Sequence, residues 1–556
     1  MFEKLFPIFK KNNPRKMKLK HLFALLILFL LTTSIHAQTI TQSNLPILIL
    51  TSSGTIGTSN IEGSIKIINN TVGLNHPNDA AQFQGTIGIK FRGSSINPKK
   101  SYNIETWVNS SGLSLDTSLL GMPAENDWVL LANYSDRSFQ RDLIGFYIHN
   151  MMGNYTPRMR LVEVILNNTY EGVYLFGEKI KRDINRLDIS KLSVIDNAPP
   201  QITGGYILKI DNSTADYWSS QIVPPNAQWG QKINFHYDEP DASTISPVQK
   251  AYIKSYVDSF ETALNGTNFQ DTFSIDGWRY FAGKGSFEEY IITAEIMKSQ
   301  DAYRLSTYLY KDKSKKLKMG PPWDLELSLF NTANCNTSKD TGWAYNYAST
   351  CGADTFLPSF WWKRLTQDSL FMKEMKCKYT IYRADFLDTN SIFHLIDSIG
   401  TILNAEQAIT RNFTKWPTWG TQLVNEPLPV STNYTEEITK IKKFLRNRLA
   451  FLDSKWLTPG CTLGIGDVAN EKSQVTVSPN PVHESLTYKI NIPETTNLDI
   501  SVSDVLGRTF ITKHLSSLTK GTHTISLDMS SLPNGIFFIH SIFNEQERNC
   551  MKVVKE

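Results

Sequence analysis

The hydrophobic pattern of this chain changes its period near residue 246. Residues 38–245 mostly alternate short apolar and polar runs cut by Gly, Asn and Pro, as in TIGIKFRGSS (86–95), and this predicts strands. In SPVQKAYIKSYVDSFETAL (246–264) apolar residues recur every three or four positions behind a Ser cap and a first-turn Pro. The sequence therefore predicts an α+β core, with a strand-rich half over 38–245 and a helix-rich half over 246–458.

The C-terminal part has a different character. Pro459 and Gly460 open a predicted linker over 459–472. Beyond it, 473–556 alternate throughout, with turn residues at sandwich-like spacing. We expect an all-β sandwich there.

The first 37 residues predict a secretory signal peptide. A basic stretch from Lys16 to Lys20 precedes an apolar run from Leu22 to Leu31, and a polar segment ends at Ala37. Met17 is an alternative start. The apolar run is too short for a membrane span, which needs about 20 residues, and a membrane anchor is the less favoured interpretation. No later segment approaches that length, so we expect no transmembrane helix in the mature protein.

Charge and cysteine usage narrow the function classes. The chain has 57 basic and 53 acidic residues, a near balance that gives no reason to expect nucleic acid as a partner.

Five cysteines form no CxxC pair, which argues against zinc. Export makes disulfides plausible. Cys335 with Cys351 brackets a polar stretch and is the favoured pair, Cys377 with Cys461 is a weaker one, and Cys550 is left over; reduced core cysteines are the alternative.

Two aspartates flank a short predicted β pair in the core. Asp301 precedes the segments 306–312 and 316–330, and Asp324 lies in the second of them. Phosphoryl transfer needs one carboxylate to orient the incoming hydroxyl and another to hold Mg²⁺. A hairpin could bring the two together, although solvated or helix-capping roles and a glycosidase pair are alternatives. No GxSxG or HExxH motif supports a hydrolase.

Basic residues suggest a phosphate-binding side. Arg92 opens the turn RGSS and is followed by Lys99 and Lys100, and we expect this segment to cradle phosphate oxygens. Glu178 could pair with such a lysine. Lys209 is a rival candidate, for which a solvated face is the favoured interpretation. The segment has neither a GxGxxG motif nor a P-loop.

One further arginine has two interpretations. Arg141 lies inside an otherwise apolar helical segment, where it could contact phosphate or form a buried ion pair.

Five ordered segments of the core resemble the spore-coat protein H (CotH) kinase-like family. They are IKFRGSSINPKKSYNIE (89–105), WVLLANYSDRSFQRDLIG (128–145), VEVILNNTYEGVYLFGEKIKRDINRLDI (162–189), GGYILKID (204–211) and residues 300–330. The resemblance implies an α+β two-lobed atypical protein-kinase-like core that binds ATP with Mg²⁺ or Mn²⁺. It assigns Asp301 as the catalytic acid and Asp324 as a metal ligand. It also places Glu326 and Ser306 near the metal, with Ser306 where kinases generally carry Asn.

The tail resembles the C-terminal sorting domain of the type IX secretion system. The likeness covers 473–556 and includes SPNP, DVLGR, SLPNGIFF and the basic strand MKVVK. It implies the outer-membrane secretion machinery as a partner, and a secreted or outer-surface location.

Two functions follow from these resemblances. One is an exported atypical Ser/Thr protein kinase that transfers phosphate from ATP to a surface or secreted protein, which the two aspartates favour. The other is a non-catalytic adhesion or scaffolding protein on the same fold, which Ser306 favours.

Overall fold

We describe the protein from a computed structural model. It describes residues 40–93, 97–212, 216–423, 425–461, 474–492, 494–504, 509–543 and 547–556. The predicted signal peptide, Ser94 and most of the predicted linker lie outside the described residues. No helix within these ranges is long and apolar enough to cross a membrane.

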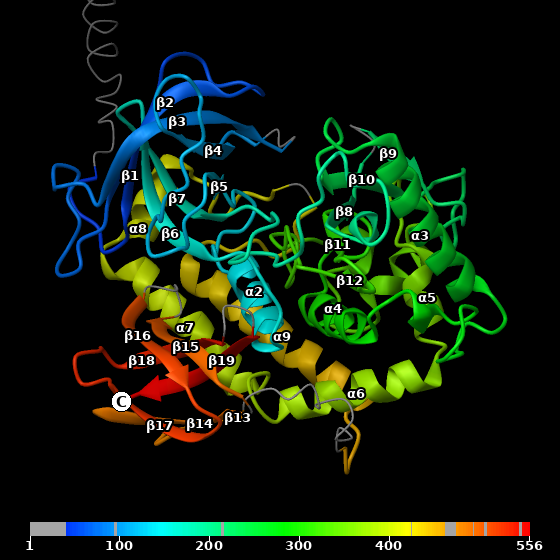
Figure 1. Cartoon of the computed structure of the whole chain (residues 1–556). Helices are drawn as coiled ribbons and strands as arrows, with labels where there is room; N and C mark the ends of the chain where they lie inside the picture. The colour runs from blue at the N-terminus through cyan, green and yellow to red at the C-terminus, as the bar shows by residue number, and fades with distance from the viewer. Residues whose placement is uncertain are drawn as a thin grey trace, which may run out of the picture.

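The first part of the described chain forms a closed β-barrel (Figure 1). Its strand order is β1-β2-β3-β4-β5-β7-β6, and parallel pairing of β1 with β6 completes the ring. The inward positions of alternating strands, such as Ile87 and Ile89, fill the barrel with a core of their own. The strands are β1 (Ile47–Ser52), β2 (Ile61–Ile68), β3 (Phe83–Arg92), β4 (Ser101–Trp107), β5 (Asp127–Leu131), β6 (Met159–Leu166) and β7 (Thr169–Glu178).

A second sheet, in the order β12-β11-β8-β10-β9, lies beside the barrel. Its strands are β8 (Tyr206–Ile210), β9 (Tyr217–Ser219), β10 (Asn234–Glu239), β11 (Thr307–Lys311) and β12 (Leu317–Met319). Strands from both sides of the predicted division at 245 therefore pair in one sheet, with Tyr308 opposite Lys209.

The predicted second strand of the β pair is too long. It was expected over 316–330, but β12 ends at Met319. Pro321 and Pro322 follow and cannot donate to a ladder, and Asp324 takes a positive φ of 60°. Residues 320–330 therefore form an irregular loop, which carries Asp324 and Glu326.

Helices pack around this sheet and against one end of the barrel. Ser246 caps α3 through a capping box with Gln249, as the sequence pattern predicts. One large apolar core joins the helices to the second sheet. The helices are α2 (Arg141–Met151), α3 (Pro247–Asn265), α4 (Lys284–Met297), α5 (Phe360–Leu365), α6 (Ser369–Arg383), α7 (Thr389–Ala405), α8 (Ala408–Lys415) and α9 (Tyr434–Trp456).

Both expected disulfides are present. Cys335 is joined to Cys351 and Cys377 to Cys461, with Cα–Cα distances of 5.7 and 5.4 Å. Cys550 is free.

The C-terminal part is all β, as predicted. One sheet has the order β13-β14-β17 and the other β16-β15-β18-β19. The two sheets share a core, and the Tyr488 hydroxyl donates across it to Ser541 Oγ at 2.7 Å. The strands are β13 (Gln474–Ser478), β14 (Ser485–Ile492), β15 (Thr496–Asp504), β16 (Thr509–Leu518), β17 (Gly521–Asp528), β18 (Gly535–Phe543) and β19 (Glu547–Lys555).

Candidate active site

The β11–β12 pair brings the predicted acidic segments together. Ser306 directly precedes β11, and Asp324 follows β12 by a few residues. Because the two strands are antiparallel, the start of β11 lies beside the end of β12. Ser306 Oγ donates to Asp324 Oδ2 at 3.3 Å. The hairpin therefore brings Ser306 to Asp324, whereas the convergence predicted at a hairpin is that of Asp301 with Asp324.

Asp324 is open to solvent on one side but enclosed by protein on the others. This enclosure raises the pKa of its carboxyl group, an effect that the charge of Arg92 opposes. Glu326, two residues on, has its pKa raised well above the usual range by burial and then by the charges of Asp324 and Asp142. The loop thus gathers negative charge that nearby cations do not fully balance.

Asp301 lies just beyond the C-terminus of α4. Its Oδ1 accepts a hydrogen bond from Arg304 Nη2 at 3.0 Å, and Arg304 also contacts Asp354 Oδ1 at 3.3 Å. Burial raises the pKa of Asp301 to about 6, while Arg304 opposes the shift and Asp324 adds to it. The influence of Asp324 indicates that the two predicted acids share one electrostatic environment.

A further acid at this site, Asp142, was missed by the sequence reasoning. It stands in the first turn of α2 and is buried, with Oδ1 accepting from the Leu325 backbone N–H at 2.8 Å and Oδ2 from Asn133 Nδ2 at 2.8 Å. Burial, followed by the charge of Asp324, raises its pKa to about 7. Asp142 thus holds the backbone between Asp324 and Glu326. The one available signal was an Asp within an apolar helical segment.

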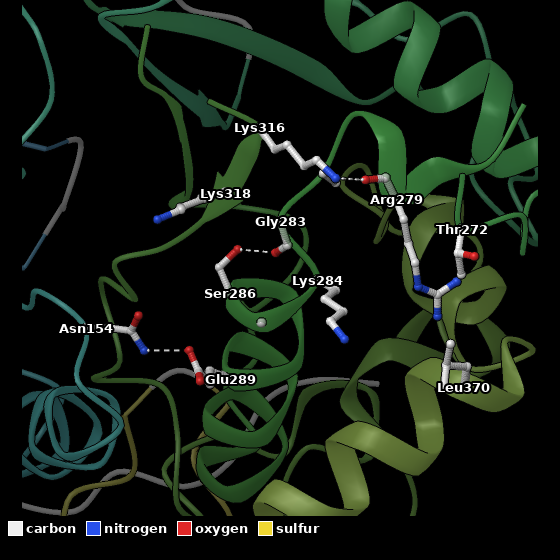
Figure 2. A pocket seen from close by; sticks show the side chains of 12 residues that line it. Asn154, Thr272, Arg279, Gly283, Lys284, Ser286, Glu289, Lys316, Lys318 and Leu370 are labelled. Atoms are coloured by element: carbon white, nitrogen blue, oxygen red, sulfur yellow. Dashed lines mark hydrogen bonds between the residues drawn. The ribbon is translucent and has the colours of Figure 1, made fainter. Parts of the chain in front are cut away.

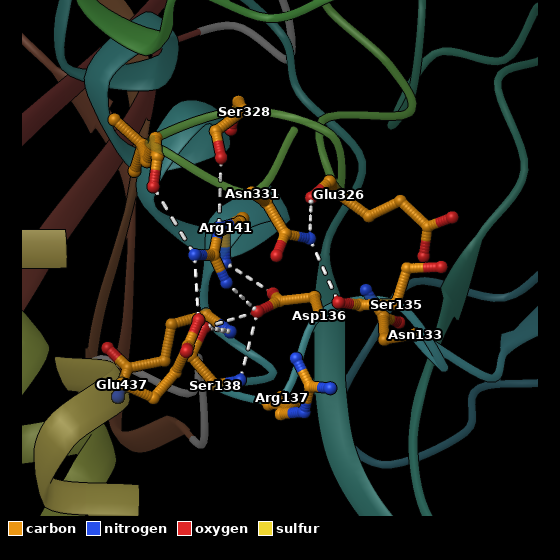
Figure 3. Close-up of polar contacts among 12 residues, drawn as sticks. Asn133, Ser135, Asp136, Arg137, Ser138, Arg141, Glu326, Ser328, Asn331 and Glu437 are labelled. Carbon is orange, nitrogen blue, oxygen red and sulfur yellow. Dashed lines mark hydrogen bonds and ion pairs between the residues drawn. The ribbon is translucent and has the colours of Figure 1, made fainter. Parts of the chain in front are cut away.

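Arg141 forms a buried ion-pair network beside the acidic loop (Figure 3). It pairs with Asp136 and, at 2.8 Å, with Glu437 Oε1 of α9, and its Nε donates to the Ser328 carbonyl at 3.0 Å. Of the two interpretations of Arg141, the structure shows the ion pair.

Asn331 ties the same loop to the segment before α2. Its Nδ2 donates to the carbonyls of Ser135 at 2.9 Å and Glu326 at 2.7 Å (Figure 3). Glu326 is therefore fixed through its backbone carbonyl, and among the described residues its carboxylate has no hydrogen bond or ion pair.

Two of the predicted cations lie close enough to influence Asp324. Arg92, at the end of β3, donates to Asn103 Oδ1 at 2.9 Å, and its guanidinium lies 5.1 Å from the ring centroid of Trp323. Lys209, on β8, pairs with Asp211 at 2.9 Å. Both charges act to lower the pKa of Asp324. The barrel and the second sheet therefore each contribute a cation to the acidic loop.

The expected lysine pairing of Glu178 is wrong. Glu178 is buried against Arg158 and contacts Arg186 at 4.0 Å, while its Oε2 accepts from Tyr155 Oη at 3.2 Å. An arginine fork satisfies a buried carboxylate better than one ammonium, and two are within reach.

Lys99 also departs from the predicted phosphate cradle. It is buried, and its Nζ donates to the Val173 carbonyl and to Asn412 Oδ1 of α8 at 3.1 Å. Through these two hydrogen bonds Lys99 links the barrel to α8. Lys100 is half-buried directly before β4.

No preassembled metal cage is found in the described parts of the chain. There, no three His, Cys, Asp or Glu side chains stand in a group that could hold an ion. Mg²⁺ commonly binds through one or two carboxylates together with water and substrate phosphates. Asp324 and Glu326, two oxygen donors on one loop, suit that mode of binding.

Comparisons with known sequences identify both folded parts. Residues 476–556 match the family model described as secretion system C-terminal sorting domain, which indicates type IX secretion to the cell surface or exterior. Comparison with curated proteins gave no match. Residues 89–452, well over half of the chain, match the family model described as CotH kinase protein. This chain therefore belongs to the CotH family.

Proposed function

We propose that this exported CotH protein is an atypical kinase that transfers the γ-phosphoryl group of ATP to a Ser or Thr hydroxyl of a surface or secreted protein. The observation that carries the proposal is the gathering of acids from separate parts of the chain. Asp142, Asp301 and Asp324 come from α2, the end of α4 and the loop after β12, and beside burial the charge of Asp324 contributes to the raised pKa of each of the other two.

The roles follow from the position of each group. Asp301 would accept the proton of the incoming hydroxyl, a task that suits a carboxylate whose pKa is raised to about 6. Arg92 and Lys209, on the barrel and the second sheet, would bind the phosphates of the nucleotide. Asp142, whose carboxylate accepts from the Leu325 backbone N–H, would act as a positioning residue for the loop that carries Asp324 and Glu326.

A divalent cation fits this set of donors. Burial raises the pKa values of Asp324 and Glu326, and nearby acids add to it, Asp211 for Asp324 and Asp324 for Glu326, so a positive ion bound there would relieve both effects. These two residues would hold it. Bound Mg²⁺ would supply charge neutralisation for the phosphate oxygens during transfer.

One observation favours a non-catalytic binding protein instead. Ser306 stands where kinases generally carry an Asn that holds a second metal, and its hydroxyl donates to Asp324. A hydroxyl is a weaker ligand than an amide carbonyl in such a site. In that alternative the acidic loop and the cations beside it would serve adhesion or scaffolding without phosphoryl transfer.

The test compares the full chain with Asp301→Asn and Asp324→Asn in labelled ATP with Mg²⁺ or Mn²⁺. We expect autophosphorylation or transfer to a mixed surface-protein acceptor to fall at least about 100-fold in either variant. The nucleotide-dependent rise in Tm should persist in Asp301→Asn and vanish in Asp324→Asn. Asp116→Asn, an exposed acid on the barrel, is the matched control. Transfer that is equal in all four proteins, or no nucleotide-dependent change in any of them, would contradict the proposal.

A further inference from the structure

A cavity lined by several charged side chains lies at the opposite end of α4 from Asp301. It has a volume of about 550 Å³ and is bounded by the start of α4, by β12 and by the first turn of α6 (Figure 2). This volume is in the range of small-molecule sites. Because α4 has 14 residues, its length of about 20 Å separates the cavity from the acidic loop.

Arg279 forms one wall of the cavity and is incompletely satisfied. Its side chain is only 7% exposed, and its Nη1 pairs with Asp368 Oδ2 at 2.6 Å. Its Nε and Nη2 are buried, and the described residues offer neither of them a hydrogen-bond acceptor. Figure 2 shows the guanidinium between Thr272 and Leu370 at the edge of the cavity. Leaving buried donors unpaired is destabilising, so an acceptor supplied by a ligand would be stabilising.

The start of α4 presents its backbone to the same space. Gly283 is the N-cap and has no side chain with which to cap the helix. Ser286, which could serve instead, donates its hydroxyl to the Gly283 carbonyl and accepts from the Met319 N–H at 3.1 Å. First-turn N–H groups and the positive end of the helix dipole attract anions.

The remaining charged groups around the cavity are mostly basic. Lys284, Lys316 and Lys318 line it together with Arg279, against the single acid Glu289. Glu289 is already paired with Lys378 at 2.7 Å, and it accepts from Asn154 Nδ2 at 3.0 Å. Lys318 is exposed, and its ammonium lies 6.0 Å from the Tyr310 ring centroid. Lys284 in turn pairs with Glu374 Oε1 at 2.7 Å, so Lys316 and Lys318 supply most of the positive charge that faces the cavity.

We propose that this cavity binds a phosphate or sulfate ester of a small polar molecule, such as a phosphorylated or sulfated sugar. The oxyanion would lie between Arg279, Lys318 and the start of α4, and the rest of the cavity would hold the attached molecule. A tetrahedral oxyanion suits the combination of backbone N–H groups, a guanidinium and an ammonium. This site does not depend on the kinase proposal, because the two lie at different ends of α4.

The test is calorimetric titration of the full chain, without nucleotide, with glucose 6-phosphate, inorganic phosphate, inorganic sulfate and unmodified glucose. We expect one site for the oxyanion-bearing probes and none for glucose. The variant Lys318→Glu should weaken binding at least about tenfold, equivalent to the loss of one charge-assisted hydrogen bond. Lys315→Glu makes the same charge change at an exposed position in the β11–β12 turn and should bind as the unmodified chain does.

A second variant examines the guanidinium itself. Arg279→Lys can keep the pair with Asp368 but removes the two unpaired donors, so it too should bind glucose 6-phosphate more weakly. If Arg279→Lys does not fold, the comparison of Lys318→Glu with Lys315→Glu tests the proposal.

Binding that chloride matches at equal ionic strength would overturn the proposal, as would equal effects of Lys318→Glu and Lys315→Glu. Asp324→Asn should retain binding. Loss of binding in Asp324→Asn would place the anion beside the acidic loop and also overturn the proposal. Failure of phosphoryl transfer has no bearing on any of these outcomes.

Discussion

At the scale of single residues, the buried charges of the core differ in how they are compensated. Arg141 is surrounded by Asp136 and Glu437, with both acids buried. Glu261 of α3 instead accepts hydrogen bonds from neutral donors, Ser220 Oγ at 2.7 Å and Trp361 Nε1 at 2.8 Å. Burial raises the pKa of Glu261 to about 7. Substitutions at the two sites should therefore act in different ways.

Arg141→Met should strongly destabilise the fold. It leaves two carboxylates buried without their cation, a change that typically costs about 3–5 kcal/mol. Urea denaturation followed by fluorescence measures the loss. Lys442→Met, which removes a more exposed ion pair with Asp397, is the control and should cost about 1 kcal/mol or less. Similar losses in the two variants would contradict a structural role for Arg141.

Glu261→Gln should make the free energy of unfolding less dependent on pH. The folded-state pKa of about 7 lies above the ordinary value of 4.5, so the folded protein holds the Glu261 proton more tightly than the unfolded chain does. The unfolding free energy is therefore highest below pH 4.5, and it falls as pH rises through 7. Gln keeps acceptor and donor capacity but does not ionise. The unfolding free energy of the variant relative to the unmodified chain should rise by about 2 kcal/mol between pH 5 and pH 8. Glu62→Gln, at an exposed position, should show no such trend.

The sequence predicted part of the candidate site at this scale. Asp324 and Ser306 meet because local strand pairing brings them together, and such pairing can be predicted from a hairpin pattern. Asp142 could not be assigned, because an acid in a first helical turn has an ordinary explanation in the helix dipole. The partner of Glu178 could not be assigned either, since the choice between lysine and arginine depends on folding far from the motif.

At the scale of secondary-structure elements, the second sheet determines which residues face the acidic loop. The β11–β12 pair was expected, but its antiparallel partner β8 lies far away in sequence. Hydrophobic alternation gives no information about such long-range partners, which explains why strands before and after residue 245 were expected in separate halves. This pairing places Lys209 opposite Tyr308, on the same sheet as the strands that flank the acids.

The disulfide between Cys335 and Cys351 should stabilise the long segment between β12 and α5. Its sequence separation is 16, and closing a loop of that size contributes about 3 kcal/mol in the chain-entropy description. The double variant Cys335→Ser, Cys351→Ser should lose about that amount in chemical denaturation. Cys550→Ser, which breaks no disulfide, should change stability far less. An unchanged midpoint in the double variant would show that packing alone holds this segment.

At the scale of the whole molecule, the sorting domain packs against the core (Figure 1). Tyr147 of α2 and Phe538 of β18 lie 5.6 Å apart between ring centroids, and Lys552 Nζ donates to Ser391 Oγ of α7 at 2.7 Å. A cavity of about 410 Å³ lies between the two parts. The domain that directs export thus contacts the helix whose first turn carries Asp142.

Deleting residues 474–556 should have two separable effects. The protein should remain in the periplasm instead of reaching the surface or exterior, as cell fractionation and immunoblotting would show. The purified remainder should melt several degrees lower, because the apolar contacts on α2 are lost. Lys513→Ala, at an exposed position on β16, should alter neither property. Export that is unaffected by the deletion would contradict the role of this domain.

The bond between Cys377 and Cys461 also sets an order in time. Cys461 is the last described residue before the sorting domain, and it is joined to the middle of α6. Because a chain is made from its N-terminus, this bond can close only after every other residue of the core has been synthesised. Formation of this disulfide therefore indicates that the core is complete. A precursor in which Cys377 and Cys461 both still react with an alkylating probe would be one that had stopped before the disulfide formed.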